Sequence, residues 1–231
     1  MMPPQSIDAN IDYLKLQQLS EEFTQHWKRL QAFYLDAVAG FTFVLSRVES
    51  EQELARGFVR GSELDSVEFQ DTRIFSYSDI FHEGFCTTGI HHATQGEVKS
   101  RNVPGGLNYT TLGQLCLISF YDFWEDYLRR EYAIAKGYLD PNETTKAVVD
   151  ECLRKYASHD LWGDLYYLRT SIVHNQGLAT SSVTKCKLIK WFKPGDLITL
   201  TPDHMRAIFL ALLTYRNELF REQFPERHIY L

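Results

Sequence analysis

The sequence lacks several features that would identify a protein class directly. Its 231 residues contain no apolar run near the ~20 residues that a membrane-spanning helix requires, so we expect no passage through a membrane. The first residues, MMPPQSIDANIDY, lack a basic start followed by an apolar stretch, so we expect no secretion signal. There is no G-x-x-x-x-G-K-[ST] loop, which argues against a P-loop nucleotide enzyme.

Cysteine is scarce and scattered, and none of the cysteines forms a C-x-x-C pair. The four are Cys86, Cys116, Cys152 and Cys186. We predict reduced thiols in a cytoplasmic protein. The stretch FHEGFCTTGIHH brings Cys86 close to His91 and His92, but the spacing matches no zinc pattern such as C-x-x-C or H-x-x-x-H. We therefore expect no metal at these residues and no other cofactor.

Positive charge is not in excess. The chain has 24 Lys and Arg against 30 Asp and Glu, a net charge of −6. Proteins that hold nucleic acid mainly by neutralising phosphates are usually basic. The balance argues against a stable, high-affinity nucleic-acid binder, but it allows an enzyme that touches a short RNA segment through a local basic patch.

A long N-terminal helix is the clearest element that the sequence predicts. Apolar residues recur every three or four positions from Leu16 to Val48, which is the period of one helix face. From about Glu51 to Tyr109 this period is lost, and seven of the thirteen glycines fall in the stretch. We predict a long irregular insertion at about 51–109, within a single domain that spans 1–231.

Capping signals and apolar spacing predict further helices after the insertion. The ranges are 111–137, 140–156, 158 or 160 to 175–177, and 202 onward. Before the last helix, KCKLIKWF and LITL flank a Pro-Gly turn, which predicts a small β-hairpin. The predicted fold class is therefore mainly α, a helical bundle with an irregular insertion and one small hairpin.

The predicted hairpin carries a local concentration of positive charge. KCKLIKWFK holds four lysines together with Trp191 and Phe192, a mixture that suits phosphate contacts and base stacking. A solvated hairpin whose lysines protect its edge explains the same residues, and we favour that interpretation.

The stretch LRTSIVHNQG places Arg169 and His174 near the end of a predicted helix. On a regular helix their side chains point about 140° apart, so they are not natural partners within one chain. They can meet if the helix unwinds near His174, or if the same segment of a second chain crosses it in a two-fold dimer.

A purely structural interpretation of this stretch is also open. A histidine at a helix C-terminus is favoured by the helix dipole, and Asn175 and Gly177 are common helix-ending residues. Arg169 would then pair with an acid such as Glu125 or Asp126 on the neighbouring helix.

Arg169-Thr-Ser-Ile-Val-His174, followed by Asn and Gly, resembles the R-x4–6-H signature of the HEPN superfamily (higher eukaryote and prokaryote nucleotide-binding domains). The resemblance covers about 111–224 and implies a HEPN-like helical bundle. Family members with this motif are typically metal-independent endoribonucleases that act as dimers, many of them in toxin–antitoxin or phage-defence systems. Thr170 departs from the family pattern, because Asn, Asp or His often follows the arginine.

The resemblance implies that Arg169 and His174 are the catalytic pair and that Asn175 contacts substrate. It further implies a homodimer, an RNA substrate, and an antitoxin or defence protein as partner. The residue types suit the reaction, since histidine exchanges protons near neutral pH and arginine can bind a phosphate through two hydrogen bonds. The alternative is a non-catalytic HEPN-like module that binds proteins or RNA without cutting it.

Overall fold

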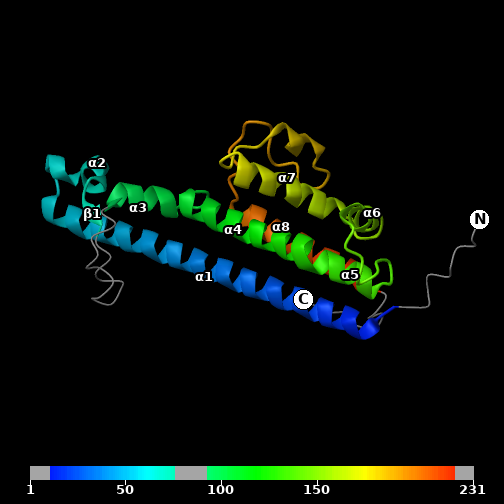
Figure 1. The fold of residues 1–231 in the computed structure, drawn as a ribbon. Coiled ribbons are helices and arrows are strands. Elements are labelled where there is room, and N and C mark those ends of the chain that lie inside the picture. The colour runs from blue at the N-terminus through cyan, green and yellow to red at the C-terminus, as the bar shows by residue number, and fades with distance from the viewer. Residues whose placement is uncertain (1–10, 76–92, 222–231) are drawn as a thin grey trace, which may run out of the picture. The chain divides into compact units, whose positions relative to one another are not determined.

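Helices make up most of the described residues, as the spacing of the apolar positions predicts (Figure 1). The structure is a computed structural model that describes residues 11–75 and 93–221. The α-helices are α1 (Tyr13–Val59), α2 (Val67–Asp71), α3 (Gln95–Asn102), α4 (Leu107–Phe123), α5 (Arg129–Ala135), α6 (Lys146–Tyr156), α7 (Asp160–His174) and α8 (Pro202–Leu219). Within the described ranges, none of the helices is both long and apolar enough to cross a membrane.

The described chain forms two compact units, and helix α1 contributes to both. The first unit contains residues 11–33, 113–199 and 203–221, and the second contains residues 34–75, 93–112 and 200–202. Each unit has buried apolar side chains of its own.

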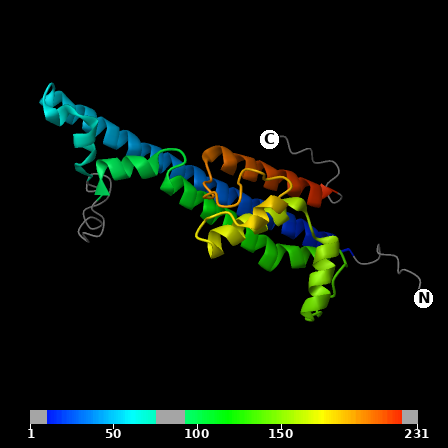
Figure 2. The ribbon, with the colours of Figure 1, turned by 90° about the horizontal axis from the view of Figure 1, so that it is seen from above.

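The core of the first unit lies between α1, α4, α7 and α8 (Figures 1 and 2). Aromatic side chains join these helices, because the Trp27 indole donates a hydrogen bond to the Phe209 carbonyl (2.9 Å) and the Trp124 and Trp162 rings stack 4.7 Å apart. Other fully buried side chains come from all four helices; they include Leu16, Leu19, Phe23, Leu117, Phe120, Leu161, Leu165, Leu168, Met205 and Leu212. Leu16, Leu19 and Phe23 belong to the apolar face predicted for the first helix, so that face is confirmed in this unit.

The helix predicted over 111–137 is divided by a wider turn. Helix α4 begins at Leu107, before the predicted cap, and is followed directly by a π-helix at Trp124–Leu128 and by α5. The chain leaves α5 at Gly137, whose φ of 71° lies in the left-handed region that favours glycine. π-Helical turns are rare and often lie at functional sites.

Helix α6 begins later than the sequence predicts. Asp140 and Glu143 do not open a helix; instead their carboxylates accept the backbone N–H groups of Asn142 and Thr145, and each closes a short turn. The helix begins at Lys146. Helix α7 matches its prediction, beginning at Asp160 and ending at His174.

The β-hairpin predicted before the last helix is wrong. A short 3-10 helix, Ser181–Lys185, leads into an irregular segment that reaches α8, with only an isolated bridge between Leu178 and Leu197 among the described residues. The reason is visible in Asp164, which is buried on α7 and accepts the backbone N–H groups of residues 187–189 (2.7–2.8 Å). These groups would otherwise be the donors of a strand.

The second unit shows that 51–109 is more regular than predicted. Helix α1 continues past Val48 to Val59, and a 3-10 helix (Glu63–Asp65), α2 and α3 follow. The strands β1 (Ile74–Phe75) and β2 (Ala93–Thr94) pair antiparallel, with Phe75 opposite Ala93. A small core forms between these elements; its buried members are Val48, Phe75, Ala93 and Val98.

Candidate functional site

Helix α7 holds Arg169 and His174 on a well-anchored scaffold. The imidazole of His159 accepts the Leu161 N–H at the helix start (3.1 Å), which satisfies one of the free N–H groups there. At the other end, the N–H groups of Asn175 and Gly177 both donate to the Ser171 carbonyl (3.1 and 3.2 Å). Gly177 has a φ of 80°, so HNQG is a helix-ending sequence, as the structural interpretation predicts.

Arg169 forms an ion pair, although with an acid that the sequence does not single out. Its Nε donates to Asp122 Oδ1 at 3.2 Å, and its guanidinium lies 5.8 Å from the centre of the Tyr121 ring. The pairing with Glu125 or Asp126 is wrong, because Glu125 binds Arg129 instead (2.9 Å). The Arg169 side chain is 29% exposed, and its two Nη atoms have no hydrogen-bond partner among the described residues.

His174 lies in the last turn of α7 with its side chain exposed. The imidazole makes no hydrogen bond or ion pair with any residue that the structure describes, so it is not used as a cap. The amide of the neighbouring Asn175 donates to the Leu178 carbonyl (2.7 Å) and closes the turn after the helix. Within one chain, Arg169 and His174 are not brought into contact, and the structure gives Asn175 a local backbone role.

The face of α7 that carries His174 is open. Gly163 is exposed, and a Cβ built there would meet no atom within 4 Å. Tyr167 and Thr170 are half-buried on this side. Val173, the residue before His174, has an apolar side chain that is 45% exposed.

The tyrosine beside Arg169 and two buried cysteines of the first unit are poor acid–base groups near neutral pH. Burial, and to a lesser extent the charge of Glu125, raise the pKa of the Tyr121 hydroxyl, so this phenol stays protonated near neutral pH. Burial also raises the pKa of the Cys116 and Cys186 thiols to about 11, which disfavours the thiolate that a cysteine nucleophile requires.

No metal centre can be assembled from the residues described. In the ranges 11–75 and 93–221, no group of three or more His, Cys, Asp or Glu side chains is arranged to hold a metal ion. The stretch with Cys86, His91 and His92, which we expect to hold no metal, lies outside the described residues.

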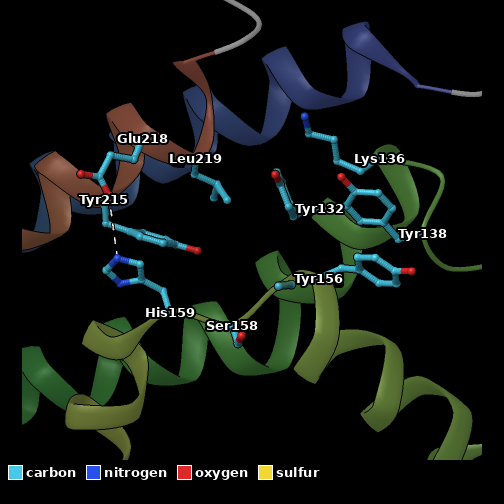
Figure 3. A pocket seen from close by; sticks show the side chains of 10 residues that line it. Tyr132, Lys136, Tyr138, Tyr156, Ser158, His159, Tyr215, Glu218 and Leu219 are labelled. Carbon is cyan, nitrogen blue, oxygen red and sulfur yellow. Dashed lines mark ion pairs between the residues drawn. The ribbon is translucent and has the colours of Figure 1, made fainter. Parts of the chain in front are cut away.

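A cavity of about 250 Å³ in the first unit was not predicted (Figure 3). Residues of α5, α6, α8 and the two loops beside α6 line it, including Tyr132, Tyr138, Tyr156, His159, Tyr215 and Glu218. The Tyr138 and Tyr156 rings stack 4.5 Å apart, and the His159 and Tyr215 rings lie 4.6 Å apart. Only the Tyr138 and Tyr156 rings lie face to face, because the His159 and Tyr215 planes are tilted by 48°. No local pattern predicts this cavity, because the residues that line it are far apart along the chain.

Comparison with known proteins gives one partial similarity. No family model matches the chain, and no solved structure matches it. Over 180 residues, the chain is 25% identical to phosphoethanolamine N-methyltransferase 1 of Arabidopsis thaliana. The match covers 71% of this chain, which spans 34% of that protein. This degree of similarity does not assign the chain to a family.

Proposed function

We propose that the chain is a HEPN-like endoribonuclease that cuts RNA without a metal, with Arg169 and His174 as its catalytic pair. The proposal rests on the motif and on one feature of its geometry. Asp122 occupies only Nε of Arg169, and this leaves the two Nη atoms available to a phosphate. Arginine binds phosphate oxygens best through two parallel hydrogen bonds, which these two atoms can supply.

The two residues would meet across a homodimer. One chain keeps them apart, because a spacing of five residues places them on different sides of α7. A two-fold axis beside the open face of α7, on the side of Arg169, would bring His174 of each chain toward Arg169 of the other, since such an interface is reciprocal. The exposed Gly163 leaves room for the close approach of a second helix.

The proposed reaction is an internal transesterification. The RNA 2′-hydroxyl loses its proton to a base and attacks the adjacent phosphorus, while the bond to the 5′-oxygen breaks and that oxygen takes a proton from an acid. The products are a 2′,3′-cyclic phosphate and a 5′-hydroxyl. At each site, His174 of one chain can take the 2′-proton and supply a proton to the leaving 5′-oxygen, and Arg169 of the other chain stabilises the charge that develops on the phosphate.

An RNA-cleavage assay in EDTA tests the proposal. Purified protein incubated with mixed RNA should give products with 2′,3′-cyclic phosphate ends. Mixing inactive Arg169→Ala with inactive His174→Ala should restore up to about a quarter of the activity, because half of the dimers are mixed and each holds one intact site. Intact RNA at high protein concentration would overturn the proposal.

A non-catalytic HEPN-like module is the second candidate. Two observations favour it: the ion pair with Asp122 offsets the charge of Arg169, and the whole chain carries a net charge of −6. Such a module would hold RNA or a partner protein, such as an antitoxin or defence component, and leave RNA intact. The assay above separates the two, because only the enzyme produces cyclic phosphate ends.

The similarity to a plant phosphoethanolamine N-methyltransferase makes methyl transfer a third candidate, supported by that match alone. Incubation of the protein with phosphoethanolamine and a labelled methyl donor, followed by a search for labelled amine, tests it directly. Labelled product together with uncut RNA would replace the ribonuclease proposal.

A further inference from the structure

The segment Lys185–Lys193, here called the basic segment, runs alongside helix α7 (Figures 1 and 2). At the start of α7, the Lys187 ammonium pairs with Asp160 (2.7 Å), and Asp164 fixes the backbone of the segment. Beyond the end of α7, Gly195 and Ala179 are joined by a backbone hydrogen bond of 2.8 Å. The segment is therefore attached at both ends of the helix that ends at His174.

Three of the four lysines of the basic segment are not explained by the local fold. Lys185, Lys190 and Lys193 are exposed, and none of their ammonium groups forms an ion pair with a described residue. Lysines on a strand edge protect it from pairing with other chains, but no strand is present here to protect. The segment itself contains no acidic residue. Asp160 offsets the charge of Lys187, while Asp164 and Asp196 bind backbone N–H groups of the segment, so the ammonium groups of Lys185, Lys190 and Lys193 stay unpaired among the described residues.

Aromatic rings stand between these lysines. The Trp191 ring stacks on the His204 ring, 4.4 Å away and tilted by 13°, and both Trp191 and Phe192 remain half-buried. His204 covers one face of the indole and fixes its orientation. Lysines alternating with oriented aromatic rings are the combination that binds single-stranded nucleic acid, through phosphate contacts and base stacking.

We infer that the basic segment is the binding surface for single-stranded RNA that leads the substrate to the end of α7. This inference rests on the proposed ribonuclease function for its choice of ligand. Charge complementarity selects a polyanion, and the aromatic rings select unpaired bases, because bases in a duplex are stacked on each other and not available. Binding is separable from cleavage, since neither Arg169 nor His174 belongs to the segment.

Binding of a fluorescent, unstructured 20-nucleotide RNA, measured by anisotropy in EDTA over a series of salt concentrations, tests the inference. The background is His174→Ala, so the RNA stays intact. Exchanging Lys185, Lys190 and Lys193 for Ser should weaken binding at least tenfold and lower the salt dependence of log K by about 2, as expected for three lost contacts with a single strand. The matched control exchanges Lys28, Lys146 and Lys155 for Ser, exposed lysines of the same unit, and should change binding less than twofold.

A second variant separates stacking from charge. Trp191→Leu should weaken binding about fivefold or more, while the salt dependence stays unchanged. Equal losses in the two lysine variants, no RNA binding in low salt, or a preference for double-stranded RNA would overturn the inference. If the wild-type protein binds RNA through the basic segment and does not cut it, the ribonuclease proposal fails and the binding surface stands. If the variant of Lys185, Lys190 and Lys193 cuts RNA as efficiently as the wild type, the ribonuclease proposal stands and the basic segment is not the surface that binds the substrate.

Discussion

Arg169 and Asp122 form an ion pair that joins α7 to α4 through a single guanidinium nitrogen, Nε. Asp122 is the second-to-last residue of α4, two positions before the π-helix, and its side chain is 39% exposed. Half-exposed pairs of this kind contribute little to the free energy of unfolding. We therefore infer that Asp122 orients Arg169: the ion pair fixes the plane of the guanidinium and leaves its two Nη atoms available to a ligand.

The exchange Asp122→Ala tests this orienting role. Without the carboxylate the guanidinium can rotate, and RNA cleavage should fall about tenfold, as is typical for a misplaced catalytic group. Asp122→Asn keeps an acceptor for Nε and should stay within about threefold of the wild type. Both should melt within a few degrees of the wild type, and kcat and KM should be measured with Tm on the same samples. Equal activity of the two variants would show that Asp122 does not orient Arg169.

Substitutions of the proposed catalytic pair should lower RNA cleavage without lowering stability. His174→Ala should lower RNA cleavage about 10²–10⁴-fold, the usual effect of losing a positioned acid or base. Arg169→Lys keeps the charge but loses the planar fork, so cleavage should also fall clearly. Neither should lower Tm much, because His174 is exposed and Arg169 lies outside the buried stripe of α7. An unchanged cleavage rate in folded His174→Ala would remove this site from consideration.

The homodimer can be tested at Gly163. A side chain there meets nothing in the isolated chain, so Gly163→Arg should preserve or raise helix stability in the monomer. If the open face of α7 is the dimer interface, the variant should convert a dimer to a monomer in light scattering at micromolar concentration. Gly40→Arg on α1 is the matched control, because a Cβ at that glycine also meets nothing. A wild-type monomer, or a Gly163→Arg dimer, would contradict the composite site.

The sequence predicts the structure correctly where residues close together in the chain determine it. The start of α8 at Pro202 and the end of α7 at His174 follow from a proline in the first turn and from the Asn and Gly residues after the helix. These signals act within a few residues, and tertiary contacts reinforce them. The mainly helical fold follows for the same reason, because apolar spacing reports directly on which face is buried.

The hairpin and the partner of Arg169 were predicted wrongly for a different reason: both depend on contacts between residues that are far apart in the sequence. The backbone donors of residues 187–189 bind Asp164, more than twenty positions away, and this removes the predicted hairpin. The prediction of Glu125 or Asp126 as the partner of Arg169 was wrong because the packing of α7 on α4 brings Asp122 to Arg169, and local spacing does not report that packing. Glu125 pairs instead with Arg129, four positions later in its own segment.

His26 gives the chain a predictable pH dependence. Burial, and then the charge of Arg29, lower the pKa of this imidazole, which stacks on Phe123 at 4.3 Å. The folded state therefore favours the neutral ring, whereas the unfolded chain takes up a proton near pH 6.5. The stabilising contribution is complete above about pH 6.5 and declines as the pH falls below it.

The exchange His26→Gln removes this titration. The difference in unfolding free energy between the wild type and His26→Gln should shrink or reverse as the pH is lowered from 7.5 to 5, in chemical denaturation at each pH. Arg29→Met should retain most of the effect, because burial is the larger cause. A difference that is constant over this range would show that His26 does not titrate as its surroundings require.

Asp164 is expected to be the most sensitive polar residue of α7. Its side chain is 1% exposed, and its two oxygens accept three backbone N–H groups from residues 187–189. Asp164→Asn turns one oxygen into a donor that faces other donors, so buried N–H groups lose their acceptors at a cost of about 2–4 kcal/mol.

The melting temperatures of Asp164→Asn and of the control Asp160→Asn, compared with that of the wild type, measure this cost. Both acids contact Lys187, but Asp160 binds only its exposed ammonium, so Asp160→Asn should leave Tm nearly unchanged. For a chain of this size, Asp164→Asn should lower Tm by about 4–15 °C. Since Asp164 holds the basic segment against α7, the folded variant should also bind single-stranded RNA more weakly at 10 °C, well below its melting transition. Equal melting temperatures for the two variants would mean that the three hydrogen bonds to Asp164 do not hold the basic segment in place.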